Sequence, residues 1–179
     1  MRGGLIMILS CFTIVAFGQQ TQIVYPDSGF TNKAEAKNLM VNGKKEGKWM
    51  EYFDTNSPYY LTIYKAGKPN SIVRLYSKNG RLESEKPYIN GKENGMQKTY
   101  YKSGQITIEQ MYKNNLPDGV YRSYSDSGVL WIEQHWSSGK LNGVEKSFDE
   151  KGRLTSETIY INGAQGATKN YDEKGNEIR

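Results

Sequence analysis

Cysteine and histidine are almost absent from this chain of 179 residues, which holds one of each, Cys11 and His135. Cys11 lies in an apolar N-terminal segment. If that segment is removed, the chain has no disulfide, thiolate nucleophile or cysteine-based zinc site. A single histidine leaves one candidate for a Ser-His-Asp triad and no histidine-rich metal site. His135 stands where related segments hold Pro87, Met111 and Ile159. We therefore expect a packing role for it, with no catalytic residues, metal or cofactor in the chain.

Long hydrophobic runs are also scarce. The longest, residues 5–17, is shorter than the roughly 20 residues that a membrane-spanning helix needs. Arg2 before it and Ala16-Phe17-Gly18 at its end are typical of a secretory signal peptide cleaved after Gly18. We expect residues 1–18 to direct export to the periplasm, the outer membrane or the medium, leaving no transmembrane segment after cleavage.

Lipidation is an alternative fate for this segment. Ile8-Leu9-Ser10-Cys11 loosely resembles a lipobox, which would make Cys11 a lipidated N-terminus. The apolar run continues past Cys11, whereas the signal of a lipoprotein should end there, so the sequence favours cleavage after Gly18.

Charge of either sign is modest. The chain has 24 Lys and Arg against 19 Asp and Glu, a net charge of +5, and losing residues 1–18 removes only Arg2 to leave +4. The charges are interspersed, which argues against nucleic acid as a partner. Leu, Ile, Val and Phe make up just under 20% of the chain, but 14 tyrosines offer large rigid surfaces for burial. A folded chain with a thin, tyrosine-rich core fits this composition.

What the chain does have is a repeat of 24 residues. Several residue types return at this spacing, which is typical of repeat architectures whose units pack only against their neighbours. The repeating positions are an aromatic set (Tyr52, Tyr76, Tyr100, Tyr124, Phe148, with Tyr171 one residue early), a second aromatic set (Tyr64, Tyr88, Tyr112, Trp136, Tyr160), a glutamate set (Glu85, Glu109, Glu133, Glu157) and two glycine sets (Gly80, Gly104, Gly128, Gly152, with Gly175 one early; Gly43, Gly67, Gly91, Gly139, Gly163, with Asn115 as the exception).

Each repeat has the pattern of a β-hairpin. Residues 96–101 and 105–112 are rich in aromatic and β-branched residues and are bounded by Gly, Asn and Ser. Asn-Gly pairs recur at the turns, where both residues tolerate positive φ. We predict an all-β array of five to six 24-residue hairpins, about eleven strands, in an extended single-layer antiparallel sheet over residues 40–179. Residues 19–39 would form an N-terminal extension or an edge strand.

Side-chain alternation predicts the faces of this sheet. Pairing Tyr76 with Leu82 places the first aromatic set and the second aromatic set on one face and the glutamates on the opposite, more polar face. A slip of one residue would instead pair Arg74 with Glu85. The sequence favours the first register without excluding the second.

The stretch Tyr88–Tyr101, with its Tyr-x-Asn-Gly start and its Gly-(x)4-Tyr-Tyr end, resembles the variant MORN repeat of the bacterial YwqK-family antitoxin group. The resemblance covers about residues 40–179. It implies a single-layer sheet of stacked hairpins, with scaffolding, protein contact or lipid binding as functions. Departures fall in the end units, where Asn56 replaces a turn glycine and the last unit is one residue short, as capping of an array would produce.

A basic set lies beside the aromatic set along the predicted sheet. Like positions would recur roughly every 10 Å, so cations between rings could grip an anionic polymer through charge and cation–π contact. The alternative is that their stems cover the tyrosine rings while their heads reach water. The candidate binding residues are Arg74, Lys98, Arg122, Lys146, Tyr76, Tyr100, Tyr124 and Phe148.

The repeated glutamates are expected to pair with nearby lysines. Hydrolysis by two carboxylates needs different environments around one cleft, whereas these four repeat in one setting. We therefore predict an exported non-enzymatic repeat protein that presents an extended β-surface to a protein or an anionic cell-envelope polymer. A self-assembling or scaffolding envelope component, or an antitoxin-like neutraliser of a partner protein, is the alternative.

Overall fold

A computed structural model describes residues 14–16, 19–21, 23–24, 38–54 and 57–178 of the chain. Most of the expected signal peptide, including Cys11, lies outside these residues, as do residues 25–37 of the expected N-terminal extension. Every regular element in the described ranges is a β-strand. In the same ranges, no helix is long and apolar enough to cross a membrane.

The strands fall into a small N-terminal hairpin and one long sheet. The hairpin pairs β1 (Ile14–Ala16) with β2 (Gln19–Thr21). The long sheet contains, in chain order, β3 (Ile23–Val24), β4 (Leu39–Val41), β5 (Lys44–Asp54), β6 (Ser57–Lys65), β7 (Lys68–Pro69), β8 (Ile72–Tyr76), β9 (Leu82–Ile89), β10 (Lys92–Glu93), β11 (Gly95–Tyr100), β12 (Ile106–Lys113), β13 (Leu116–Tyr124), β14 (Leu130–Ser137), β15 (Lys140–Leu141), β16 (Gly143–Phe148), β17 (Leu154–Ile161), β18 (Ala164–Tyr171) and β19 (Glu177–Ile178).

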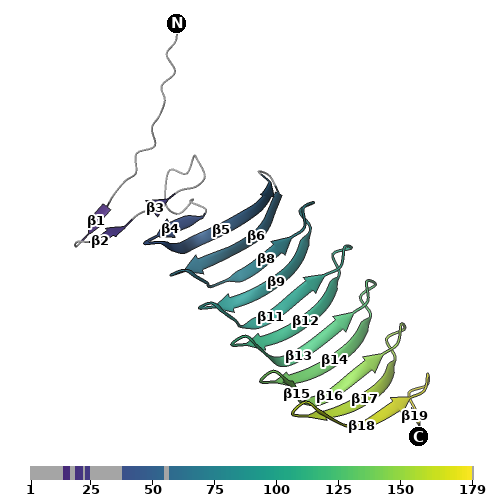
Figure 1. The fold of residues 1–179 in the computed structure, drawn as a ribbon. Helices are drawn as coiled ribbons and strands as arrows, with labels where there is room; N and C mark the ends of the chain where they lie inside the picture. Colours follow the sequence, from purple (N-terminus) through teal and green to yellow (C-terminus); the bar gives the residue numbers. More distant parts are fainter. Residues whose placement is uncertain (1–13, 17–18, 22, 25–37, 55–56, 179) are drawn as a thin grey trace.

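The long sheet is a single antiparallel layer built in chain order. Within the described ranges β3 pairs only with β4 and β19 only with β18, so the sheet is open at both ends. Successive hairpins follow one another along one axis from β5 to β18 (Figure 1). This confirms the predicted all-β array of hairpins.

One end of every hairpin closes with a two-residue turn in which both central residues have positive φ, the conformation of a type I′ turn. Asn90 and Gly91, for example, have φ of 52° and 81°. The amide of Gly91 donates to the carbonyl of Pro69 in the preceding unit, 2.8 Å away, and that of Asn90 donates to the Asn70 side chain at 2.8 Å. These turns therefore join each repeat to the one before it.

The same side-chain bond recurs along the array and was not anticipated from the sequence. In four successive units, an Asn or Asp oxygen accepts from a turn amide 20 residues later. The acceptors are Asn70, Asn94, Asp118 and Asn142, and the donors are the amides of Asn90, Asn114, Ser138 and Asn162.

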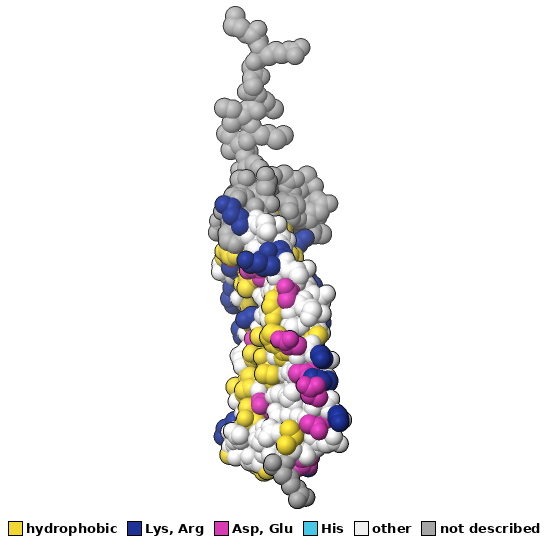
Figure 2. Space-filling model, turned by 90° about the vertical axis from the view of Figure 1, so that its right-hand side faces the viewer, with side chains coloured by type: hydrophobic (Ala, Val, Ile, Leu, Met, Phe, Trp, Pro, Cys, Tyr) yellow, Lys and Arg dark blue, Asp and Glu magenta, His cyan; other side chains and the backbone are white. Residues whose placement is uncertain are grey.

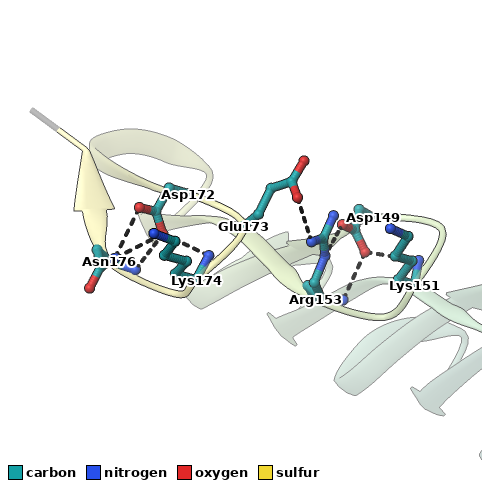
Figure 3. Close-up of polar contacts among 7 residues, drawn as sticks. All are labelled: Asp149, Lys151, Arg153, Asp172, Glu173, Lys174 and Asn176. Atoms are coloured by element: carbon teal, nitrogen blue, oxygen red, sulfur yellow. Dashed lines mark hydrogen bonds and ion pairs between the residues drawn. The ribbon is translucent and has the colours of Figure 1, made fainter.

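The other end of each hairpin from β8 to β19 closes with a five-residue turn whose fourth residue is a glycine with positive φ. In the last two of these turns Asp149 and Asp172 fix the loop by accepting from backbone amides two and four residues ahead (Figure 3). Arg153 also links Asp149, at 2.7 Å, to Glu173 of the next turn, at 3.0 Å. The predicted glycine set that begins at Gly80 is thus a set of turn residues.

A β-bulge next to each of the first four five-residue turns changes the predicted faces. Tyr76 pairs with Leu82 as expected, but Arg74 also pairs with Glu85, because Glu83 is inserted between the two pairs. Both registers considered from the sequence therefore occur in one hairpin. The prediction that the glutamates lie opposite the tyrosines and cations is wrong. Since one inserted residue reverses the alternation, the glutamates share the face of Arg74 and Tyr76, and the second aromatic set lies on the other face.

The two faces differ in how deeply their side chains are covered. We call the face with Arg74 and Glu85 the ladder face and the opposite one the covered face. Buried side chains of the hairpins gather on the covered face, and most of them are polar. They are Thr62, Val73, Ser84, Gln110 and Thr158, each 7% exposed or less. The sheet thus has a thin core on one side, as its composition predicted.

His135 has the packing role expected of it. It is an exposed residue of β14, and its ring Nδ1 lies 3.2 Å from the carbonyl oxygen of Val144. Gly143 beside it has a φ of 137°, and a Cβ atom there would lie 2.9 Å from the Cβ of His135. A glycine is required at this position because the two strands approach closely around the histidine.

Candidate functional site

Charged side chains of alternating sign cross the centre of the ladder face, one on each strand. Each is the direct cross-strand partner of the next, which is the geometry in which opposite charges stabilise a sheet. We call this row the charge ladder. In order it consists of Arg74, Glu85, Lys98, Glu109, Arg122, Glu133, Lys146, Glu157 and Lys169.

The four predicted cations are all ion-paired within the ladder. The two arginines lie 2.8 Å from their glutamates, Arg74 Nε to Glu85 Oε1 and Arg122 Nε to Glu133 Oε2. The lysine pairs are looser, at 3.5 Å for Lys98 with Glu109 and 3.6 Å for Lys146 with Glu157. This confirms that the glutamates pair with basic residues. The charged heads of the four cations therefore contact carboxylates, whereas the alternative interpretation expected them to extend into water.

The first aromatic set supplies a second partner for the glutamates. Tyrosine hydroxyls donate to carboxylates 14 or 15 residues earlier, in the preceding hairpin: Tyr100 to Glu85 at 2.8 Å, Tyr124 to Glu109 at 3.0 Å and Tyr171 to Glu157 at 2.7 Å. The last unit is one residue short, yet Tyr171 reaches the glutamate as its counterparts do.

These contacts shift the pKa of both partners. Burial and the hydrogen bond to Glu85 raise the pKa of Tyr100 to about 12. Burial raises the pKa of Glu85, but the bonds from Tyr100 and Arg74 outweigh it and the pKa lies below its usual value. Glu85 is therefore ionised at neutral pH and serves as an acceptor, which is unlike the proton-sharing carboxylate of an acid–base catalyst.

Tyr76 and Phe148 are the two predicted site residues outside this pattern. The position that should supply a carboxylate to Tyr76 holds Leu61, which is the cross-strand partner of Arg74. Phe148 has no hydroxyl, so Glu133 is held by Arg122 alone among the described side chains. The remaining candidates, Arg74, Lys98, Arg122, Lys146, Tyr100 and Tyr124, all meet glutamates.

Two strips of apolar side chains flank the charge ladder on the same face. Towards the type I′ turns, cross-strand pairs of apolar residues and His135 form the first strip: Ile72 with Pro87, Met96 with Met111, Val120 with His135, and Val144 with Ile159. Towards the five-residue turns, the first aromatic set forms the second: Tyr76 with Leu82, Tyr100 with Ile106, Tyr124 with Leu130, and Phe148 with Leu154.

These strips run the length of the array and are partly open to solvent. Ile63 and Ile159, both at the first strip's repeat position, are 49% and 45% exposed. Viewed from the side of the five-residue turns, a band of hydrophobic side chains follows the long axis, with acidic and basic side chains beside it (Figure 2). The ladder face therefore combines apolar contact area with charges that already neutralise one another.

Metal-binding side chains do not cluster in the described ranges: no group of three or more His, Cys, Asp or Glu residues is placed to hold an ion. The arrangement offers instead a regular surface of apolar strips, hydroxyls and paired charges. Such a surface is suited to non-covalent contact over several repeats.

The family comparison agrees with the repeat seen in the structure. A family model described as the MORN repeat variant matches residues 93–114, 117–137 and 141–162. A search of the curated proteins finds no match. The matched stretches correspond to successive hairpins from β10 to β17, and the same turns and pairings continue on either side of them. Three consecutive units of this chain are thus similar to the MORN repeat variant, the repeat of an all-β array with a binding or scaffold role.

Proposed function

We propose that this chain is an exported, non-enzymatic repeat protein whose ladder face binds a protein partner. The observation that carries the proposal is the composition of that face: a charge ladder neutralised by its own members, between two partly exposed apolar strips. A protein surface can cover such strips and match the ladder, whereas a purely ionic ligand would find few free charges.

An anionic envelope polymer is less well matched by this geometry. Lys98, Arg122 and Lys146 each have a glutamate on both neighbouring strands, so a polyanion would have to displace existing pairs. Its binding would depend strongly on salt, because exposed ionic contacts are screened. Contact through the apolar strips would depend on salt much less.

The resemblance to the YwqK-family antitoxin group points to one class of protein partner, an exported toxin that the array neutralises. A second copy of the chain, giving a self-assembled scaffold, is another. Each would use the same face in repeated contacts, where several weak interactions add to a strong one.

A matched pair of variants tests the face. Ile159→Lys places a charge on the apolar strip of the ladder face, where Ile159 is 45% exposed. Ile178→Lys places the same charge on the opposite face, at an isoleucine that is 53% exposed and pairs with Asn170. Both variants and the wild-type chain serve as baits for the envelope fraction, with thermal unfolding as the check that each is folded.

We expect one partner protein to be captured by the wild-type chain and by Ile178→Lys, at low and high salt alike, and to be lost with Ile159→Lys. Equal capture by all three baits would show that the ladder face is not the surface that binds the partner. Capture of polysaccharide or other polyanion that disappears in salt would favour the ionic alternative.

A further inference from the structure

Two departures from the repeat meet at one point of the covered face. Asn115 replaces the turn glycine, and Glu93 occupies a position that holds Lys45, Pro69, Pro117 and Leu141 in other units. The amide of Glu93 donates to the side-chain oxygen of Asn115 at 2.7 Å, and the amide of Asn115 donates to the carbonyl of Glu93 at 3.0 Å. The units with proline at this position cannot make the first bond, because proline has no amide proton. Asn115 therefore fixes Glu93 in a way that is special to this unit.

The carboxylate of Glu93 lies partly out of water without a full set of partners. Its Oε1 atom is buried and has no hydrogen-bond partner, and no ion pair to Glu93 is formed in the described ranges. Burial raises the pKa of this carboxyl, and the charge of Lys86 opposes that rise only in part. A buried charge of this kind is costly unless something pairs with it.

Two tyrosines of the second aromatic set stand beside this carboxylate. Tyr88 is the cross-strand partner of Glu93, and Tyr112 belongs to the next hairpin. Burial raises the pKa of each hydroxyl, and the charge of Glu93 raises it further in both cases. The pairing of Glu93 with Tyr88 and its bonds to Asn115, three residues after Tyr112, bring both tyrosines near this carboxylate.

The first hairpin shows what this position of the repeat can hold. Lys45, two periods before Glu93, lies on the covered face with its Nζ 4.3 Å from the ring centroid of Trp49 and 5.0 Å from that of Tyr64. The same Nζ lies 3.2 Å from Glu51 Oε1. An ammonium group is therefore held there by two aromatic rings and one carboxylate, which is a favourable environment for a cation. Around Glu93 two tyrosines and the carboxylate are present. The charge of Lys86 acts on this carboxyl, but no lysine of the described residues forms an ion pair with it.

We infer that Glu93, Tyr88 and Tyr112 form a binding site for an alkylammonium group, as on a lysine side chain of a bound peptide. The site lies on the face opposite the charge ladder, so it does not depend on the proposed function. Asn115 acts as a positioning residue, since it holds the backbone of Glu93. The two tyrosines supply the aromatic surface and Glu93 the countercharge.

The test is a titration of the full chain with Nα-acetyl-lysine methylamide, followed by NMR of the tyrosine ring protons. Tetramethylammonium chloride tests the cation without N–H donors, and Nα-acetyl-norleucine methylamide is the neutral control. The variants are Glu93→Gln, Tyr112→Leu and, as a matched carboxylate on the same face, Glu145→Gln, each checked for folding by circular dichroism.

We expect saturable shifts of the Tyr88 and Tyr112 rings with the lysine probe and none with the norleucine probe. Glu93→Gln and Tyr112→Leu should each weaken binding about tenfold or more, as loss of a charge-assisted contact does, whereas Glu145→Gln should leave it unchanged. Binding of tetramethylammonium alongside lysine would identify a general cation site, and binding of lysine alone would identify a site for primary amines. Absence of saturable shifts, or equal affinity in wild type and Glu93→Gln, would overturn the inference.

Discussion

The first hairpin and the central hairpins use the same three kinds of side chain on opposite faces of the sheet. In the centre, Glu109 accepts from Tyr124 and pairs with Lys98 on the ladder face. In the first hairpin, Glu51 accepts from Tyr59 and pairs with Lys45 on the covered face, at 2.5 Å and 3.2 Å.

The row that is charged in the centre is apolar in the first hairpin. Met50 and Leu61 are cross-strand partners there, and the Tyr52 hydroxyl lies 3.7 Å from the sulfur of Met50. The type I′ turn and the antiparallel pairing with the next unit are nevertheless the same. The comparison teaches that the turns and the bonds between units set the fold, while a network of carboxylate, cation and tyrosine is added to whichever face the side chains allow.

The largest effect should come from deletions that change the number of strands. Deleting Gly91–Asn114 removes one whole period and joins Asn90 to Asn115, which gives an Asn-Asn turn like the native turn at Asn114 and Asn115. We expect a folded, shorter array whose free energy of unfolding is lower by the contribution of about one repeat. The stability of such an array is approximately the sum of contributions from each repeat and from the contacts between neighbouring repeats. Deleting residues 91–102 instead should unfold the chain, because every later strand would run in the wrong direction. Circular dichroism and denaturant unfolding measure both, and equal damage from the two deletions would contradict a modular array.

The next largest effect should come from the central carboxylates. Glu109→Gln removes the charged partner of Lys98, Arg122 and the Tyr124 hydroxyl, and we expect the free energy of unfolding to fall by roughly 1–3 kcal/mol. Glu133→Gln should cost less, because Phe148 gives Glu133 no hydroxyl. The exposed Glu83 is the control, with a loss of no more than about 0.5 kcal/mol for Glu83→Gln. If the charge ladder did not stabilise the fold, the three variants would lose the same small amount of unfolding free energy.

Much of this organisation could be predicted from the residues. The spacing of Gly80 and Gly91, with their successors, located both kinds of turn, and the aromatic positions located the strands. The faces could not be predicted, because one residue inserted at the bulge, such as Glu83, reverses the alternation on which the prediction depended.

The tyrosine–glutamate bonds and the Asn and Asp side-chain bonds between units were missed for a different reason. Tyr100 and Glu85 are 15 residues apart, and their contact depends on which strand follows which in space. The recurrence of Asn70, Asn94, Asp118 and Asn142 at the 24-residue period was a visible signal for the bonds between units, but turn residues are common enough that it did not stand out.

A smaller effect, of opposite sign, should come from completing the ladder. Phe148→Tyr would place a hydroxyl near Glu133 in the position that Tyr100 has relative to Glu85, because Lys146 and Glu133 pair as Lys98 and Glu85 do. We expect a gain in the free energy of unfolding of about 0.5–1.5 kcal/mol. Glu133→Gln in the same background is the control, since it should remove most of the gain. A loss of stability in Phe148→Tyr would contradict the stabilising role assigned to the tyrosine–glutamate bond.

The smallest effect should be a dependence on pH at Glu93. Because its pKa is higher in the folded chain than in the unfolded chain, the folded state binds more protons between the two values, and stability falls as pH rises through that range. Glu93→Gln should therefore be more stable than wild type at pH 7, with the difference vanishing below the ordinary pKa of a glutamate. Denaturant unfolding at several pH values measures this, and Glu85→Gln is the contrasting variant. Glu85 has a lowered pKa, so its stabilising effect is present at neutral pH and is lost as pH falls through its folded pKa.

The most direct measurement combines stability and binding in one variant, Lys98→Gln with Arg122→Gln. If the cations belong to a neutral ladder and the apolar strips hold the partner, the double variant should lose stability in denaturant unfolding. Glu109 loses both of its countercharges, and Glu85 and Glu133 each lose one. The double variant should still capture the partner from the envelope fraction at low and high salt. Unchanged stability together with loss of capture would contradict the account and identify the cations as the contact surface.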